Sequence, residues 1–278
     1  DDYSENADDI ISSTVATAVD SLDIANGPIG AWVLITSPSG QVFTLIGVLH
    51  HLFVDGLSWL ILLHDLAEEL GVSNKRISQE TNLSMSGYAN AIWQAPVLDL
   101  ARSQSEYWNN ILHRGSKVMK SSQAAIYSRP DGGWPRGSCK YYEIELAAFR
   151  NASQVAREKF SAPLAYLSLA TFLQVLGKKT GVSDYYIAFE GHGRSDITGE
   201  TPHETVGWLT SLYCLFIQDL SANTKEATIR IEKILNDVPN SGVGFGLLRH
   251  LSKSVPLGDK NDYSWPTILF NYLGDLGI

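Results

Sequence analysis

The chain has 278 residues, of which 44% are hydrophobic, so it can bury a sizeable core as one large domain or two lobes. Its 21 basic and 30 acidic side chains give a net charge of −9 at pH 7, without the basic surface that nucleic acids and anionic membranes require. No apolar run reaches the length of a membrane span, so we expect neither a nucleic-acid nor a membrane partner. The two cysteines, Cys139 and Cys214, form no metal-binding pair and suit a reducing, cytoplasmic compartment.

The first part of the chain predicts a helix, a β-hairpin and a second helix. Apolar residues recur on one helical face of residues 8–22, and a Gly-Pro break follows them. Residues 31–36 and 42–49 are rich in β-branched and large apolar side chains and flank a Ser-Pro-Ser-Gly turn, which predicts a hairpin. From residue 57 the apolar positions follow a helical period again, and Gly71 marks the end of this helix.

A polar stretch joins the second strand to this helix, and its residues read His-His-Leu-Phe-Val-Asp-Gly-Leu-Ser-Trp from position 50 to 59. Free backbone N–H groups and the positive end of the helix dipole favour a developing anion at such a place. His50, His51, Asp55 and Gly56 are therefore candidate functional residues. A purely structural interpretation stays open, in which the histidines are polar residues at a strand end and Asp55 caps the helix.

The middle of the chain predicts the boundary between two lobes. A helical pattern covers residues 96–112, and residues 121–138 concentrate Ser, Gly and Pro, as in a connection. Beyond it we expect a strand at 141–146 and helices at 147–160 and 163–179, the last stopped by Gly181. We therefore expect an N-terminal lobe over 1–120, a connection over 121–138 and a C-terminal lobe over 139–278.

A second candidate site follows the strand expected at residues 185–189, where the chain reads Glu190-Gly-His-Gly-Arg194. A carboxylate at a strand end, followed by two glycines, lets the backbone approach a ligand closely. Arg194 can hold the loop, or Glu190 itself, through paired hydrogen bonds. The alternative is a surface turn with an incidental ion pair.

Three further sequence blocks follow the stretches at 50–59 and 190–194: Thr-Val-Gly-Trp-Leu-Thr-Ser-Leu-Tyr at 205–213, Val-Pro-Asn-Ser-Gly-Val-Gly-Phe-Gly at 238–246, and Phe-Asn-Tyr-Leu-Gly at 270–274. The first runs into a strand expected at residues 212–217. The glycines of the second block are not a dinucleotide fingerprint, because their spacing is wrong and a Pro-Asn turn precedes them. In this order, the five blocks from 50 to 274 resemble the epimerization domains of nonribosomal peptide synthetases, within the condensation-domain superfamily.

The resemblance implies a mixed α/β (α+β) fold made of two chloramphenicol-acetyltransferase-like lobes, arranged as a V-shaped pseudo-dimer with a tunnel between them. The opening part of the first lobe has no match, so we expect this lobe to be incomplete. Such domains invert the α-carbon of an aminoacyl or peptidyl thioester from L to D. The substrate is carried on the phosphopantetheine of a peptidyl carrier protein domain, which makes that domain and neighbouring synthetase domains the implied partners. No metal, nucleotide or flavin cofactor bound directly is implied.

The family pattern assigns catalysis to His51 and Glu190, which we expect to face each other across the crevice between the lobes. Because the α-proton beside a thioester is only weakly acidic, the reaction needs a base on one face, an acid on the other and donors for the enolate oxygen. Which face each group serves stays open, and so does the choice between backbone N–H groups near Gly56 and the Tyr272 hydroxyl as those donors. The resemblance implies supporting roles for His50, Asp55, Gly56, Arg194, Asn271 and Tyr272, and places Trp59, Trp208, Ser211 and Tyr213 along the substrate tunnel.

Three residues, Ser195, Glu204 and Cys214, differ from those that are common at these positions in the family, although none of them is a proposed catalytic residue.

Two other functions remain open. A condensation domain would use the same histidine stretch to form a peptide bond between carrier-bound substrates, but that reaction needs no second acid/base group such as Glu190. A non-catalytic carrier-docking fragment is the third interpretation, which the incomplete first lobe keeps open.

Overall fold

The computed structural model describes residues 7–37, 40–72, 83–120, 139–199, 202–252, 257 and 265–274, apart from the side chains of Phe43, Ala95 and Pro96. The chain forms two compact units: the first comprises residues up to Met85 together with Glu204–Leu209, and the second comprises Ser86–His203 and the chain from Thr210. This division differs from the expected one, because residues 86–120 belong to the second unit and a short later segment belongs to the first. The expected connection at 121–138 lies outside the described residues.

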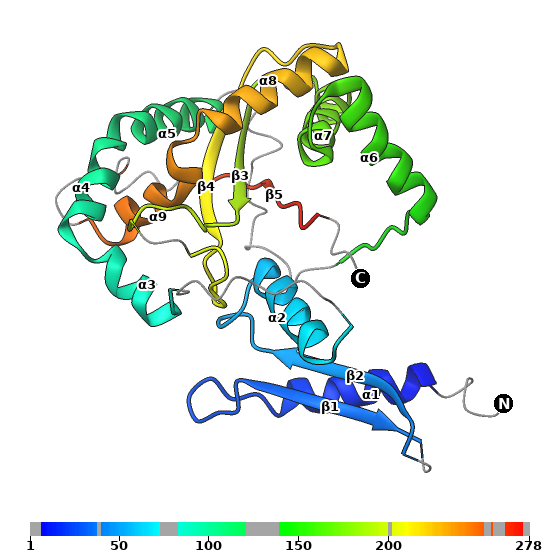
Figure 1. Cartoon of the computed structure of the whole chain (residues 1–278). Coiled ribbons are helices and arrows are strands. Elements are labelled where there is room, and N and C mark those ends of the chain that lie inside the picture. The colour runs from blue at the N-terminus through cyan, green and yellow to red at the C-terminus, as the bar shows by residue number, and fades with distance from the viewer. Residues whose placement is uncertain are drawn as a thin grey trace. The chain divides into compact units, whose positions relative to one another are not determined.

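The first unit is a β-hairpin between two helices (Figure 1). Strands β1 (Gly30–Thr36) and β2 (Val42–Leu49) pair antiparallel, which confirms the predicted hairpin. Side chains alternate between the faces of a strand, so Ala31 and Val33 lie against α1 (Ala7–Asp20), while Trp32 points to the other face. There it meets Trp59 of α2 (Gly56–Glu69) edge to face, with ring centroids 6.3 Å apart.

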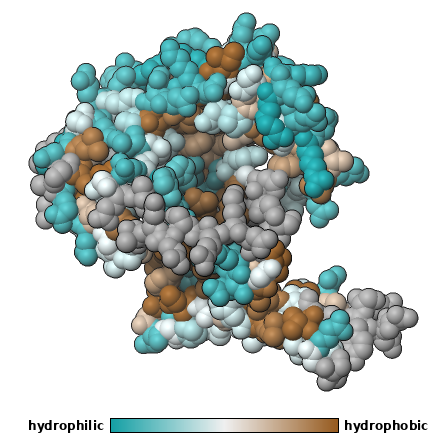
Figure 2. Space-filling view, viewed as in Figure 1, coloured by the Kyte–Doolittle hydropathy of each residue, from teal (hydrophilic) through white to brown (hydrophobic). Residues whose placement is uncertain are grey.

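The face of the hairpin that carries Trp32 keeps hydrophobic side chains exposed. Leu34 lies opposite Leu45, and they are 54% and 42% exposed. Figure 2 shows hydrophobic residues on the visible surface of this unit. Because β2 reads as a nearly continuous apolar run, both of its faces are hydrophobic and the buried face could not be chosen from alternation.

The second unit surrounds a three-stranded sheet of order β4–β3–β5. Strand β3 (Tyr185–Gly191) pairs antiparallel with β4 (Ser211–Ile217) and parallel with β5 (Leu269–Phe270). Helices α4 (Ala95–Ser103), α5 (Ser105–Met119) and α9 (Val243–His250) lie on one side of the strands, and α6 (Leu146–Phe160) and α7 (Leu164–Thr180) lie on the other (Figure 1). The unit also contains α3 (Met85–Ile92), α8 (Thr224–Asn236) and the 3-10 turn Pro239–Gly242.

The core of the second unit explains why α4 and α5 belong to it. Trp108 of α5 is fully buried and its ring meets Phe245 of α9 edge to face, with centroids 5.1 Å apart. Val97 and Ala101 of α4 join the same hydrophobic cluster, together with Tyr186 of β3. Burying these large side chains supplies the main stabilisation of the unit.

Several expected elements differ from the structure. The strand expected at 141–146 is wrong: Tyr141 and Tyr142 are 88% and 84% exposed in irregular chain, and α6 starts at Leu146. Strand-forming side chains make no strand without a partner strand. The helix expected at 96–112 is divided at Gln104 into α4 and α5. The helix before Gly181 is confirmed, and this glycine has the left-handed φ of 73° that ends it.

In the part of the chain that the structure describes, no single helix is long and apolar enough to cross a membrane. Helices α6 and α7 together have the length and composition of a membrane span, but they are bent by 92° relative to each other.

Candidate functional site

The loop between β2 and α2 carries the two histidines and is closed by backbone hydrogen bonds. The His50 N–H donates to the Ile29 carbonyl at 2.9 Å, and the Phe53 N–H donates to the His50 carbonyl at 2.9 Å. The His50 Nδ1 accepts from the Leu52 N–H at 3.1 Å, which places the ring proton of the neutral form on Nε2. His50 is thus held within its own loop.

Asp55 is a buried clamp as well as a helix cap. Its carboxylate is 2% exposed, and its Oδ1 accepts from the Ser58 N–H at 2.9 Å, which caps α2. Its Oδ2 accepts from the Leu209 N–H at 3.0 Å, while the Gly207 N–H donates to the Ser58 hydroxyl at 3.0 Å. The geometry therefore agrees with the expectation that Asp55 orders the loop, and it joins two sequence blocks that lie about 150 residues apart.

His51 lies at the surface of the first unit beside the segment that Asp55 holds. Its ring is tilted by 57° against Trp208, with centroids 5.4 Å apart. Neither ring nitrogen forms a hydrogen bond with the described residues. An imidazole that is positioned by ring contact and keeps both nitrogens accessible can accept or donate a proton. Trp208 is 47% exposed, and Trp59 is partly buried against Trp32.

In the second unit, Glu190 lies at the end of β3 and is joined to a distant block. Its Oε2 accepts from the Asn271 Nδ2 at 2.5 Å. The contact follows from the sheet register, because β5 runs parallel to β3 with Phe270 beside Phe189, which places the next residue of each strand side by side. The other carboxylate oxygen forms no hydrogen bond with the described residues and remains accessible for a ligand.

The block at 238–246 packs against the strand end that carries Glu190. Gly191 pairs with Ser211 across the sheet, and the Ser211 hydroxyl donates to the Ser241 carbonyl at 2.8 Å. A Cβ on Gly191 would lie 2.8 Å from that hydroxyl and 3.1 Å from that carbonyl, so a larger residue does not fit. Asn240 and Ser241 have left-handed φ values of 47° and 50°, and the Gln104 amide donates to the Asn240 side chain at 2.6 Å. This turn therefore fixes the position of the Glu190 backbone.

Arg194 orders the loop after Glu190. It is 1% exposed, its backbone N–H donates to the His192 Nδ1 at 3.0 Å, and its Nη1 donates to the His192 carbonyl at 3.1 Å. Burial raises the pKa of Tyr88, and the nearby positive charge of Arg194 partly offsets that effect. The buried guanidinium thus holds its own loop, which is one of the two roles expected for Arg194; the other was to bind Glu190.

Two tyrosines expected near the substrate have different surroundings. Tyr213 is 3% exposed, its ring packs against Trp108 and Phe189 at 5.9 and 5.6 Å, and burial raises its pKa. It is a core residue, contrary to the expectation of a tunnel position. The next two residues of β4, Cys214 and Leu215, are buried as well, so both faces of the strand are covered at this point. Tyr272 lines a cavity beside α6.

Within the described ranges, no group of three or more His, Cys, Asp or Glu side chains could hold a metal ion.

Comparison with known protein families assigns the chain to one of them. The model of the family described as "Condensation domain" matches residues 1–275. The chain therefore belongs to the condensation domain family.

Individual relatives agree with this assignment. Over 265 residues the chain is 29% identical to bacitracin synthase 3 of Bacillus licheniformis, covering 92% of this chain and 4% of the relative. Among solved structures, it resembles the epimerization domain from the third module of tyrocidine synthetase B, with a TM-score of 0.68, 22% identity, and coverage of 95% of this chain and 60% of that one. The first condensation domain of the CDA synthetase gives a TM-score of 0.57 and 15% identity, covering 88% of this chain and 54% of that one.

These similarities confirm the expected fold class, a mixed α/β fold of the chloramphenicol-acetyltransferase type. They include both condensation and epimerization domains, so the fold alone does not distinguish the two reactions. The chain spans only a small part of the curated relative and about three fifths of the epimerization domain.

Proposed function

We propose that this chain is an epimerization domain, which inverts the α-carbon of an aminoacyl or peptidyl thioester carried by a partner domain. The observation that carries the proposal is the environment of Glu190: one carboxylate oxygen is anchored by Asn271 and the other is accessible. A positioned carboxylate that keeps an accessible oxygen is suited to proton transfer. A condensation reaction has no evident use for it.

The proposed chemistry assigns one proton transfer to His51 and the other to Glu190. One group removes the α-proton, the thioester carbonyl takes up the negative charge as an enolate, and the other group protonates the opposite face of the carbon. The accessible nitrogens of His51 support its part in this scheme. Asp55, whose carboxylate accepts backbone and hydroxyl hydrogen bonds in a buried position, positions the histidine loop and takes no proton.

The proposed partners follow from the tethered substrate. A thioester on a phosphopantetheine arm requires a peptidyl carrier protein domain, supplied within a synthetase or by a separate chain. We also propose a cytoplasmic location. In its support, Cys139 and Cys214 are both free thiols.

A condensation domain is the second candidate, and the name of the matching family together with the CDA synthetase structure favours it. The two reactions give different products. A condensation domain would join the loaded substrate to an amine on a second carrier and leave the configuration of the α-carbon unchanged. A carrier-docking fragment would bind the carrier and give neither product.

The test begins with a carrier domain loaded with an L-configured substrate. After incubation with the chain, the thioester is hydrolysed and the D fraction is measured, and we expect this fraction to rise toward an equilibrium mixture. Glu190→Gln should abolish the rise, while Glu106→Gln, a change at an exposed carboxylate of α5, should leave it intact. A peptide product with a second carrier, and no D product, would instead identify a condensation domain.

Deuterated water separates the two proton transfers. His51→Ala and Glu190→Gln should each lower the rate of inversion by about two to four powers of ten, the usual contribution of a positioned acid or base. The variant that keeps its base on the L face should still exchange the α-proton of an L substrate for deuterium while making little D product. The other variant should exchange only from a D substrate. Inversion by Glu190→Gln within a few-fold of the unmodified rate would reject the two-base mechanism.

A further inference from the structure

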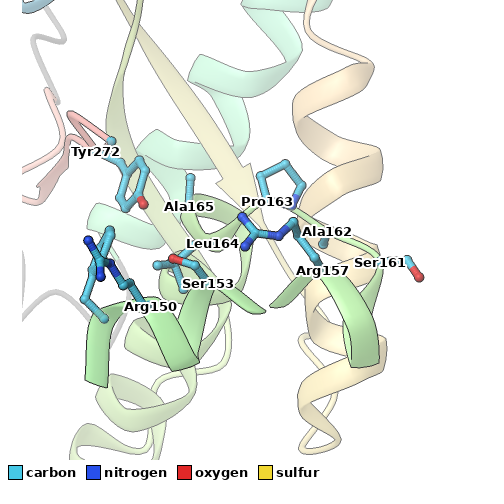
Figure 3. A pocket seen from close by; sticks show the side chains of 11 residues that line it. Arg150, Ser153, Arg157, Ser161, Ala162, Pro163, Leu164, Ala165 and Tyr272 are labelled. Carbon is cyan, nitrogen blue, oxygen red and sulfur yellow. The ribbon is translucent and has the colours of Figure 1, made fainter. Parts of the chain in front are cut away.

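A cavity of about 660 Å³ lies in the second unit, where α6, the start of α7 and the segment after β5 meet. Figure 3 shows that the side chains of Arg150, Ser153, Arg157 and Tyr272 converge on this space, whereas Ser161 points away from it. None of these side chains belongs to the proposed acid/base pair. The cavity therefore calls for a separate chemical explanation.

The sequence of α6 places its two arginines together by helical spacing. Residues 150, 153 and 157 are separated by three and four positions, so they share one face of the helix. The nearby carboxylate of Glu158 accepts a hydrogen bond from Gln154 at 2.8 Å on the neighbouring face. Neither Arg150 nor Arg157 forms a hydrogen bond or ion pair with any described residue. Two arginines without an ion partner in the described part of the chain thus line one cavity, in a protein whose net charge is −9.

The chemistry of this lining selects a phosphoryl group. Guanidinium groups bind phosphate oxygens through paired, charge-assisted hydrogen bonds, and two of them can offset the single negative charge of a phosphodiester or the double charge of a phosphate monoester. The Ser153 and Tyr272 hydroxyls can donate further hydrogen bonds to the same anion. The volume greatly exceeds that of a bare anion, and the apolar side chains of Leu164 and Ala165 form another part of the wall.

We infer that this cavity is a binding site for a phosphate ester, whose phosphoryl group lies between Arg150 and Arg157 and whose organic part contacts the apolar wall. Two sources share this chemistry: the phosphodiester of a carrier-bound arm, and a free small phosphate ester. The first source rests on the proposed function, whereas the second does not. Tyr272 follows Asn271, the partner of Glu190, so one short segment contacts both the candidate catalytic carboxylate and this cavity.

The first experiment titrates inorganic phosphate into the chain and measures binding by calorimetry or by NMR. We expect the Arg150→Gln, Arg157→Gln double variant to bind phosphate about tenfold more weakly or worse, and higher salt to weaken binding to the unmodified chain. Arg230→Gln, at an exposed arginine of α8 without a partner among the described residues, is the matched control and should bind as the unmodified chain does. The measurement uses neither a carrier nor turnover, so its outcome is independent of the epimerization proposal.

The second experiment measures the affinity of a carrier domain with and without its phosphopantetheine arm. If the double variant weakens binding of the arm-bearing carrier about tenfold and leaves the bare carrier unaffected, the ligand is the carrier-borne phosphodiester. If the double variant weakens phosphate binding alone, the ligand is a small phosphate ester, and either result supports the site. Unchanged affinities for both phosphate and the arm-bearing carrier would overturn the inference.

Discussion

Replacing Asp55 by alanine is the most direct test of the clamp that joins the histidine loop to residues 207–209. The substitution removes the acceptor of two backbone N–H groups, those of Ser58 and Leu209, and of the Ser58 hydroxyl. Each buried N–H left without an acceptor costs about 1–3 kcal/mol, so the two together predict a loss of about 2–6 kcal/mol in the free energy of unfolding of the first unit. This range includes the loss of the helix cap.

Two further variants, Asp55→Asn and Asp65→Ala, separate the loss of these hydrogen bonds from the general effect of removing an acidic side chain. Asp55→Asn keeps one acceptor oxygen and remains a good helix cap, but it turns an amide toward one of the two N–H donors, so it should lose about 1–3 kcal/mol. Asp65→Ala, at an exposed position of the same helix, should change the stability by less than about 0.5 kcal/mol. The expected order of stability is therefore unmodified chain and Asp65→Ala, then Asp55→Asn, then Asp55→Ala.

Urea unfolding measures the free energy of unfolding of each variant, and amide hydrogen exchange shows which part of the chain is destabilised. Exchange should accelerate in peptides that contain Ser58 and Leu209 in Asp55→Ala, because both N–H groups lose their acceptor. Exchange in β3 of the second unit should change much less. If Asp55→Ala unfolds like Asp65→Ala and the amide of Leu209 stays protected, then the carboxylate does not hold the two blocks together.

Two further predictions concern packing and reactivity. Gly242→Ala should destabilise the second unit by about 2–4 kcal/mol in urea unfolding, because the residue has a φ of 83° and a Cβ would lie 1.9 Å from the Tyr213 ring. Gly246→Ala, a helical position with open space around it, should be neutral or stabilising by about 0.5–1 kcal/mol, and equal effects at both positions would refute the packing argument. At pH 8, iodoacetamide should modify the exposed Cys139 in the folded chain, as measured by mass spectrometry. It should spare Cys214, whose thiol is buried with its pKa raised to about 11, until urea unfolds the chain, so rapid modification of the folded chain at Cys214 would contradict its burial.

The features that sequence predicted correctly are those set by neighbouring residues. The hairpin follows from two apolar runs around a turn, and the start of α2 follows from an aspartate three positions before Ser58. The same kind of signal was available for α8 and was missed: Asn223 accepts from the backbone N–H groups of the next turn, and an acidic residue stands three positions after it. Local pattern was sufficient in each of these cases.

The features that sequence did not predict depend on which surfaces meet. Nothing in the helical period of α5 shows that Trp108 is buried beside Phe245 in the second unit, since any apolar partner would satisfy that period. The partnership of Glu190 with Asn271 depends on a two-residue strand that pairs in parallel, too short to predict from its composition. Tyr213 matches a family block, yet only the sheet register reveals that its ring lies in the core.

The contact between Asp55 and Leu209 also bears on how the chain matures during synthesis. The acceptor and the donor are 154 residues apart, so this hydrogen bond cannot form in the first unit until Leu209 has left the ribosome. At about 5–20 residues per second, this delay is roughly eight to thirty seconds. Throughout that interval the buried carboxylate has only the cap of its own helix, and the hydrophobic face of the hairpin is already present on the nascent chain. The hairpin is therefore translated before the second unit but is completed later than its own synthesis, and this interval is when we expect the nascent chain to be most prone to aggregation.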